Sequence, residues 1–221
     1  MSGGVAVAVP ELRLEGVAVR HRRRRLVSAL TWTHRAGRIA WIVGENGAGK
    51  SSLLRVLAGR ARPAAGAVAL LDPSGRPAER LYYHPAMRLP AGITVGEWRR
   101  FVGRLGGTDD RDAAPDRDVA ALLRPDVPSH RLLRRLSTGE SKRLLLEALL
   151  GRPAPFVFLD EPYEHLSARA RDGLTATLVA RARESVVVVA TNQPVPAYAR
   201  GPVVHVDGER AIIDPGTEGA S

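Results

Sequence analysis

Eight consecutive residues of this 221-residue chain have the types and the spacing of a phosphate-binding loop. Residues 44–51 read Gly-Glu-Asn-Gly-Ala-Gly-Lys-Ser and fit the pattern G-x-x-x-x-G-K-[ST]. Glycines let successive backbone N–H groups turn toward a phosphate, and the N-terminus of a following helix adds free amides and the positive end of its dipole. Lys50 is expected to contact the outer phosphates, and the Ser51 hydroxyl to coordinate Mg²⁺. Taken alone, the pattern also allows a turn that binds nothing.

Two acidic residues follow an apolar run in the C-terminal half of the chain. Residues 156–159 read Phe-Val-Phe-Leu, which predicts a strand buried on both faces, as in a parallel sheet. Asp160, at the end of this strand, is expected to lie beside the phosphate loop and to hold Mg²⁺, directly or through water. Glu161 is placed to act on a water molecule that attacks the γ-phosphate. The alternative is an acidic strand end that faces solvent.

A second anion-binding segment is predicted at residues 136–140, which read Leu-Ser-Thr-Gly-Glu. Ser137 and Thr138 stand where the helix containing residues 144–150 would begin. Their backbone amides, together with the Ser137 hydroxyl, would offer donors to an anion at the positive end of the helix dipole. By itself, however, the segment is better explained as an ordinary N-capped helix of the core.

The elements around these residues predict buried strands alternating with helices, preceded by an antiparallel hairpin. Residues 38–43 form a short apolar run before the phosphate loop, and residues 52–58 have apolar positions at helical spacing after it. Residues 12–19 and 26–33 predict the hairpin, whose arginine-rich tip at 20–25 is either solvated or attracted to lipid head groups or phosphate. Further strands are predicted at 67–71, 81–84, 185–190, 203–206 and 211–213, further helices from 93 and over 169–183, and a small insert of helices and loops over 103–128.

The composition is that of a globular protein without disulfides. Apolar residues make up 44% and charged residues 25% of the chain. No apolar run approaches the roughly 20 residues needed to cross a membrane. Cysteine is absent, and this absence fits a cytoplasmic protein. No signal peptide is visible. The formal charge of +10 is carried mainly by arginine, because Lys50 and Lys142 are the only lysines. We attribute this skew to the base composition of the genome rather than to binding of nucleic acid or lipid.

Taken together and in this order, the motifs resemble those of the nucleotide-binding domain of ATP-binding cassette (ABC) ATPases. Residues 44–52 match the Walker A loop, residues 136–140 the family signature, and residues 159–162 the Walker B strand, and residues 163–167 fall where the D-loop follows. The signature distinguishes this family from other phosphate-loop ATPases, and the resemblance covers nearly the whole chain.

The resemblance implies an α/β fold with one ABC ATPase domain over residues 1–221. The expected architecture is a P-loop NTPase three-layer αβα core with an N-terminal antiparallel β subdomain and an inserted α-helical subdomain. Residues 1–90 and 151–221 would form the nucleotide-binding core with the β subdomain. Residues 91–150 would form the helical subdomain that carries the signature.

The resemblance also implies a mechanism and a set of site residues. Two such domains close head to tail on two ATP molecules, each held between the phosphate loop of one domain and the signature of the other. The implied nucleotide-binding residues are Gly44, Glu45, Asn46, Gly47, Ala48, Gly49, Lys50, Ser51, Ser52, His21, Ser137, Thr138, Gly139 and Glu140. The implied catalytic residues are Glu161, Lys50 and Asn192, and the implied ligands of Mg²⁺ are Ser51, Asp160 and His84.

Several positions depart from the family pattern. No glutamine stands in the Q-loop region at 83–86, so His84 or a neighbour would have to sense the γ-phosphate or the metal. Asn192 stands where the family usually places a switch histidine, and an asparagine donates a hydrogen bond but carries no titrating charge. His21 is the nearest candidate for the family's aromatic residue near adenine. Thr138, Glu140 and Ser167 replace the commoner Gly, Gln and Asp. We expect ATP binding to survive and hydrolysis to be retained, at a normal or a slow rate.

The leading hypothesis is an ATP-binding and ATP-hydrolysing subunit that drives a separate transmembrane permease, peripheral on the inner, cytoplasmic face of the cell membrane. Its partners are then the permease, contacted over about residues 82–104, and a second ABC domain in a homo- or heterodimer, and no nucleic acid is expected. One alternative is a soluble family member that acts on nucleic acid or ribosomes, with the basic charge as its footprint. The other is a degenerate cassette that binds ATP as the structural partner of an active one.

Overall fold

The computed structural model describes residues 9–22, 24–73, 79–105, 123–194, 199, 201–207 and 210–215 of the chain. The chain divides into two compact units. The first comprises Met1–His84, Ala154–Pro162 and Arg181–Ser221, and the second comprises Pro85–Pro153 and Tyr163–Ala180. The predicted subdomain limits, with a helical part at 91–150, stay a prediction.

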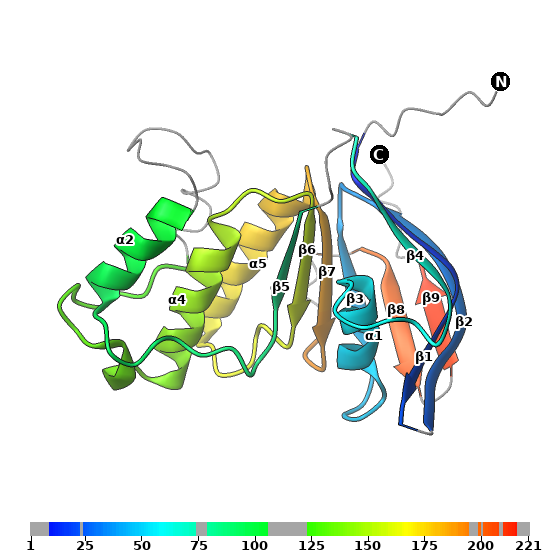
Figure 1. The fold of residues 1–221 in the computed structure, drawn as a ribbon, viewed down its shortest axis with the longest axis horizontal. Helices are drawn as coiled ribbons and strands as arrows, with labels where there is room; N and C mark the ends of the chain where they lie inside the picture. Colours follow the sequence, from blue (N-terminus) through cyan, green and yellow to red (C-terminus); the bar gives the residue numbers. More distant parts are fainter. Residues whose placement is uncertain are drawn as a thin grey trace. The chain divides into compact units, whose positions relative to one another are not determined.

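The first unit, in its described part, is built on a six-stranded sheet in the order β5-β6-β7-β3-β8-β9 (Figure 1). Its strands are β3 (Ile39–Val43), β5 (Arg80–Tyr83), β6 (Phe156–Asp160), β7 (Val186–Thr191), β8 (Val203–Asp207) and β9 (Arg210–Asp214). The strands from β5 to β8 pair in parallel, and β9 is antiparallel to β8. Every residue of β6 and β7 is buried, as expected of apolar runs inside a parallel sheet. This order brings the C-terminal ends of β3, β6 and β7 to one edge of the sheet.

A second sheet of the first unit is antiparallel and has the order β2-β1-β4. The strands β1 (Glu11–His21) and β2 (Arg24–Arg35) form the predicted hairpin, which is thereby confirmed. The strand β4 (Ala65–Leu71) pairs with the other side of β1. The sequence predicted a strand at this position but did not say which strand it would join.

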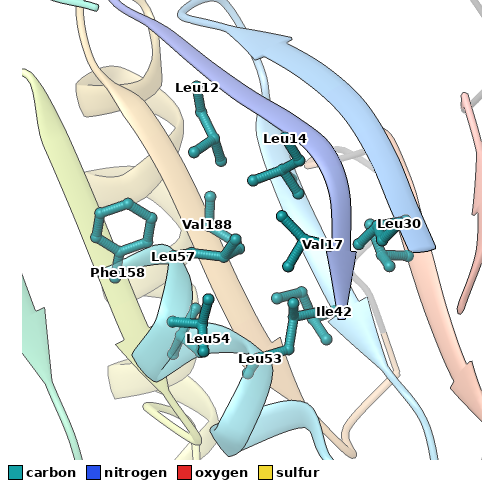
Figure 2. Packing of buried hydrophobic residues seen from close by; sticks show 14 of the residues in the cluster. Leu12, Leu14, Val17, Leu30, Ile42, Leu53, Leu54, Leu57, Phe158 and Val188 are labelled. Carbon is teal, nitrogen blue, oxygen red and sulfur yellow. The ribbon is translucent and has the colours of Figure 1, made fainter. Parts of the chain in front are cut away.

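One hydrophobic core joins the two sheets of the first unit around α1 (Lys50–Leu57). Leu53, Leu54 and Leu57 are completely buried, and Figure 2 shows their side chains close to those of β1, β3, β6 and β7. The three leucines lie on one face of the helix. Burying one such side chain stabilises a fold by about 1.5–3 kcal/mol. Core packing therefore holds α1, and with it the end of the phosphate loop, in a fixed place against the sheet.

His34 is a buried ionisable residue of the hairpin, with 6% of its surface exposed. Its ring stacks on Trp32 with centroids 5.3 Å apart, and its Nε2 lies 3.0 Å from the backbone oxygen of Arg38. Burial lowers the pKa of His34 to about 4 because the apolar surroundings disfavour the charged ring. The neutral ring, donating from Nε2 to the Arg38 oxygen, is therefore the form that the fold accommodates.

The neutral state of His34 predicts that acid weakens the first unit. A histidine in the unfolded chain titrates near pH 6.5. The contribution of neutral His34 to the free energy of unfolding is therefore complete above about pH 6.5 and is lost as the pH falls from about 6.5 to 4. Between pH 7 and pH 5, His34 is expected to lower the free energy of unfolding by about 2 kcal/mol. The variant His34→Gln retains a donor for Arg38 but does not titrate. Urea unfolding at pH 7 and pH 5 should show a smaller fall in the free energy of unfolding for the variant than for the wild type. An equal fall in both proteins would contradict the prediction.

The second unit is mainly helical in its described part (Figure 1). Its helices are α2 (Val95–Leu105), the short 3₁₀ helix η1 (Leu133–Arg135), α4 (Thr138–Leu150) and α5 (Ala168–Ala182), which ends in the first unit. Its core contains Val95, Val127, Leu133 and Leu144. A capping box begins α2, because the backbone N–H of Thr94 donates to Glu97 Oε2 at 2.7 Å and the Thr94 hydroxyl oxygen accepts from the backbone N–H of Glu97 at 3.3 Å. Most of the predicted insert at 103–128 lies outside the described residues.

None of the helices in the described part of the chain is both long enough and apolar enough to cross a membrane.

Candidate functional site

The predicted phosphate loop connects β3 to α1 in the first unit. A Cβ atom at Gly44 would overlap the backbone oxygen of Val206 in β8. Gly49 caps α1 with a φ of 115°, which other residues rarely adopt, and a Cβ atom there would lie 2.9 Å from the Cβ of Leu26 in β2. The loop can therefore approach β8 and β2 this closely only because glycine occupies both positions.

Lys50, the first residue of α1, folds back over the loop that precedes it. Its Nζ donates to the backbone oxygens of Gly44 and Glu45, at 2.9 and 3.1 Å. It also lies 3.6 Å from Glu161 Oε1, and only 5% of the lysine side chain is exposed. A buried ammonium held at the mouth of a glycine loop is a strong donor for an anionic phosphate oxygen.

Ser51 and Asp160 meet where α1 begins and β6 ends. The Ser51 hydroxyl donates to Asp160 Oδ1 at 2.9 Å. Burial raises the pKa of Asp160 above its usual range, while the Ser51 hydrogen bond and the charges of Arg55 and Lys50 act in the opposite direction. A hydroxyl beside a buried carboxylate forms a set of hard oxygen donors, which is the chemistry that Mg²⁺ prefers.

Glu161 follows Asp160 in an unusual backbone conformation. Its φ of 45° lies in the left-handed region, which costs a non-glycine residue about 1–3 kcal/mol and is often found at functional sites. The backbone N–H of Glu161 donates to the Ala190 oxygen of β7 at 2.8 Å. Its carboxylate oxygen Oε2 accepts a hydrogen bond from the backbone N–H of Asn192 at 3.1 Å, while Oε1 faces Lys50. The turn after β6 thus directs this carboxylate to the phosphate loop.

The open side of the loop is a pocket lined by Gly44, Glu45, Asn46, Asn192 and Gln193. The side-chain Nδ2 of Asn192 donates to Asn46 Oδ1 at 3.3 Å, so β7 delivers the predicted switch residue to the loop. Gln193 was not predicted as a site residue. A signal was nevertheless present, because it is the only glutamine in the chain and directly follows Asn192.

The signature segment begins α4 of the second unit with a complete capping box. The Ser137 hydroxyl oxygen accepts from the backbone N–H of Glu140 at 3.2 Å, and Glu140 Oε2 accepts from the backbone N–H of Ser137 at 2.7 Å. The bond from the Ser137 backbone holds the pKa of Glu140 below its usual range. Arg131 Nη1 donates to the other carboxylate oxygen at 3.0 Å. Glutamate in place of the family's commoner glutamine therefore has an ionic partner, which sequence reasoning missed.

The start of α4 also packs directly on the segment at 163–167, the predicted D-loop. A Cβ atom at Gly139 would lie 2.8 Å from the backbone oxygen of His165. Lys142 is buried, and its Nζ donates to the backbone oxygen of Glu164 at 2.9 Å. This contact was also missed, although Lys142 is one of only two lysines in an arginine-rich chain.

The two predicted histidines occupy different surroundings in the first unit. His84 follows β5, where its ring lies tilted against Tyr82 with centroids 5.7 Å apart, and a positive charge on it would oppose the burial that raises the pKa of Asp160. His21 ends β1 at the exposed hairpin tip, and none of the contacts seen among the described residues joins its side chain to the loop. The roles of both toward a metal or adenine stay predictions.

The structure therefore brings one group of predicted residues together within a single unit and places the other group in the second unit. The first group is the loop from Gly44 to Ser52 together with Asp160, Glu161 and Asn192. The second group is Ser137, Thr138, Gly139 and Glu140.

A phosphate loop after one parallel strand, with two carboxylates after another strand at the same edge, defines a phosphate-loop NTPase of the α/β class. The α/β class predicted from the sequence is confirmed. The model of the ABC transporter family matches residues 27–164, and the chain belongs to this family. It is an ATP-binding subunit of the ABC transporter family with ATPase activity, as the motifs predicted.

Individual relatives agree with this assignment. The chain is 36% identical over 182 residues to the cytochrome c biogenesis ATP-binding export protein CcmA of Novosphingobium aromaticivorans, covering 80% of this chain and 86% of that protein. It is 32% identical to the tylosin resistance ATP-binding protein TlrC of Streptomyces fradiae, covering 90% of this chain but only 42% of that longer protein. A putative ABC transporter ATP-binding protein of Pyrococcus furiosus shares the fold, with a TM-score of 0.74 at 18% identity over 89% of this chain and 97% of that chain.

Proposed function

We propose that the chain drives a separate transmembrane permease by closing on ATP with a second ABC domain, at the cytoplasmic face of the cell membrane. The observation that carries the proposal is the convergence of Lys50, Ser51, Asp160 and Glu161 on one end of α1. These four side chains supply a cation for phosphate, oxygen donors for a metal and a carboxylate for water. The relative CcmA, named as an ATP-binding export protein, supports the assignment to transport.

Within the first unit, each residue has a defined task toward ATP. The loop glycines present backbone N–H groups to the phosphates, and Lys50 exchanges a carbonyl partner for a phosphate oxygen. Glu161 accepts a proton from the attacking water and orients it. The Asn192 side chain offers a neutral donor on the same side of the loop.

The residues present fit a magnesium ion. Ser51 and Asp160 are oxygen donors in direct contact, and the buried Asp160 carboxylate has a raised pKa that a nearby divalent cation would lower. When bound, Mg²⁺ neutralises charge on the outer phosphates. Ser51 would hold it directly, and Asp160 directly or through water.

Replacing Asp160 by asparagine is expected to raise the Mg²⁺ concentration needed for half-maximal ATP hydrolysis by about 10- to 100-fold. The variant keeps the shape of the side chain and an acceptor for Ser51, but it removes the charge that attracts the metal. The measurement is a Mg²⁺ titration of turnover at saturating ATP. An unchanged half-maximal concentration would remove Asp160 from the metal site.

The second nucleotide-contacting surface is the start of α4. The Ser137 hydroxyl already accepts a bond from Glu140, so its own proton is available for a phosphate oxygen. Thr138 and Gly139 are the first helical residues, whose backbone N–H groups lack partners within the helix. In the closed dimer, these donors face the ATP held by the phosphate loop of the other domain.

The proposal is tested by trapping the ATP-bound state and identifying what accompanies it. A tagged Glu161→Gln variant is expressed in its native cell and recovered from detergent-solubilised membranes with ATP present. We expect an integral membrane protein in near-stoichiometric yield, and much less of it with a Lys50→Met variant that binds ATP weakly. Recovery of ribosomal proteins or nucleic acid, with nothing from the membrane, would instead support a soluble role.

A further inference from the structure

Side-chain amides are rare in this chain, and all of them line one pocket. The full sequence contains two asparagines and one glutamine, namely Asn46, Asn192 and Gln193. All three line the pocket at the mouth of the phosphate loop. Asn46 lies within the loop, whereas Asn192 and Gln193 follow β7, so the fold brings them together from opposite ends of the chain.

The two asparagines belong to a series of hydrogen bonds that ends at the carboxylate of Glu161. Asn192 Nδ2 donates to Asn46 Oδ1 at 3.3 Å, and the backbone N–H of Asn192 donates to Glu161 Oε2 at 3.1 Å. The other oxygen of Glu161 lies 3.6 Å from Lys50 Nζ. One residue, Asn192, therefore connects the loop to Glu161 through its side chain on one side and its backbone on the other.

We propose that Asn46 is a positioning residue, which fixes Asn192 and thereby holds the Glu161 carboxylate in place for the attacking water. The inference rests on the proposed function, in which Glu161 acts on that water. Asn192 is exposed, so its side-chain bond to Asn46 is its anchor to the loop. Without that bond, the turn that follows β7 keeps its internal bond from the Gln193 backbone N–H to Thr191 Oγ1 but loses its side-chain link to the loop, so the backbone N–H that orients Glu161 is held less firmly.

A neutral amide pair suits this position because of the charges around it. Lys50 and Glu161 already form an ion pair at the loop, and the phosphates of ATP bring further negative charge. An amide can donate to one partner and accept from another without adding charge of its own. The pair can therefore hold the turn rigidly and leave the electrostatic balance between Lys50, Glu161 and phosphate unchanged.

The test is a double-mutant cycle on the full chain, with the variants Asn46→Ala, Asn192→Ala and the combination of both. Asn192→Ala keeps the backbone N–H that bonds to Glu161 and removes the side chain, which is both the anchor to Asn46 and the neutral donor on that side of the loop. Each single variant is expected to lower kcat about tenfold, with KM for ATP changed less than about threefold. If the two side chains act as one unit, the double variant should have a kcat within about twofold of either single variant.

Two further variants distinguish positioning from a general disturbance of the pocket. Gln193 lines the same pocket, and its side chain has no hydrogen bond to either asparagine among the described contacts, so Gln193→Ala should combine multiplicatively with Asn46→Ala. Asn46→Asp keeps the acceptor oxygen for Asn192. It should therefore retain more kcat than Asn46→Ala, although its charge beside the phosphates raises KM.

Several results would overturn the inference. Multiplicative effects of the two asparagines on kcat, an unchanged kcat in Asn46→Ala, or an effect confined to KM would each show that Asn46 does not position Glu161. If Lys50→Met and Glu161→Gln abolish turnover while the asparagine cycle is multiplicative, the proposed function stands and only this inference fails. If both of those variants keep wild-type turnover, the proposed site itself is wrong and the inference fails with it.

Discussion

Replacing Glu161 by glutamine is expected to lower the rate of ATP hydrolysis by about 10²- to 10⁴-fold, the usual contribution of a positioned general base. The glutamine keeps the shape of the side chain and an oxygen for the Asn192 backbone N–H, but it cannot accept a proton from water. Because Lys50 and the loop glycines are untouched, ATP binding should remain within a few-fold of wild type. Single-turnover hydrolysis and a separate ATP-binding titration measure the two effects independently.

A matched control for this substitution is Glu184→Gln, which changes an exposed carboxylate of the same unit. Turnover of this control should equal that of the wild type, which shows that the loss of one negative charge is not itself the cause. If purified Glu161→Gln hydrolyses ATP at the wild-type rate, Glu161 is not the base, and the strained turn after β6 has another purpose.

Replacing Lys50 by methionine is expected to weaken ATP binding by about 10- to 100-fold and to abolish turnover at ordinary ATP concentrations. The reason is the loss of the buried ammonium, since a hydrogen bond to a charged group contributes about 1.5–3 kcal/mol and 1.4 kcal/mol corresponds to a tenfold change in affinity. The substitution also leaves Glu161 without the cation that lies 3.6 Å from its carboxylate. Titration with a fluorescent ATP analogue gives the affinity directly.

The chain offers an unusually close control for this variant, because it contains only one other lysine. Lys142→Met makes the same substitution at a second buried lysine, whose partner is the backbone oxygen of Glu164 in the second unit. We expect Lys142→Met to lower stability, because it leaves that oxygen without its donor, but to retain ATP binding. Equal loss of ATP affinity in both variants would show that Lys50 acts through stability and not through phosphate.

Most secondary-structure elements and three chemical motifs could be predicted from the sequence because each depends on neighbouring residues. The strand at 156–160 was predicted from four adjacent apolar residues, and β6 is buried throughout. The N-cap at Ser137 was predicted from residue types at a helix start, and the structure adds the reciprocal bond, which the Ser137 backbone N–H donates to the Glu140 carboxylate. Such features depend only on local backbone geometry, so the residue types in a short stretch of sequence are enough to predict them.

Contacts between distant segments could not be predicted in the same way. The pairing of β4 with β1, and the hydrogen bond between Asn46 and Asn192, join residues that no local pattern connects. The ion pair of Arg131 with Glu140 spans only nine positions, yet it also depends on how η1 turns the chain back toward α4. In each case the partner is chosen by packing, which depends on the whole unit at once.

The amino-acid sequence alone predicted that this chain carries a phosphate loop, a signature segment and a pair of carboxylates, and hence that it belongs with the ABC ATPases. It did so because backbone-lined anion sites need particular residue types at consecutive positions. The three-dimensional fold was needed to show that the chain's three side-chain amides share one pocket, and that Glu161 is held between Lys50 and the backbone of Asn192. Those relations arise from the order of β3, β6 and β7 in the sheet, which brings the ends of strands far apart in sequence to one edge.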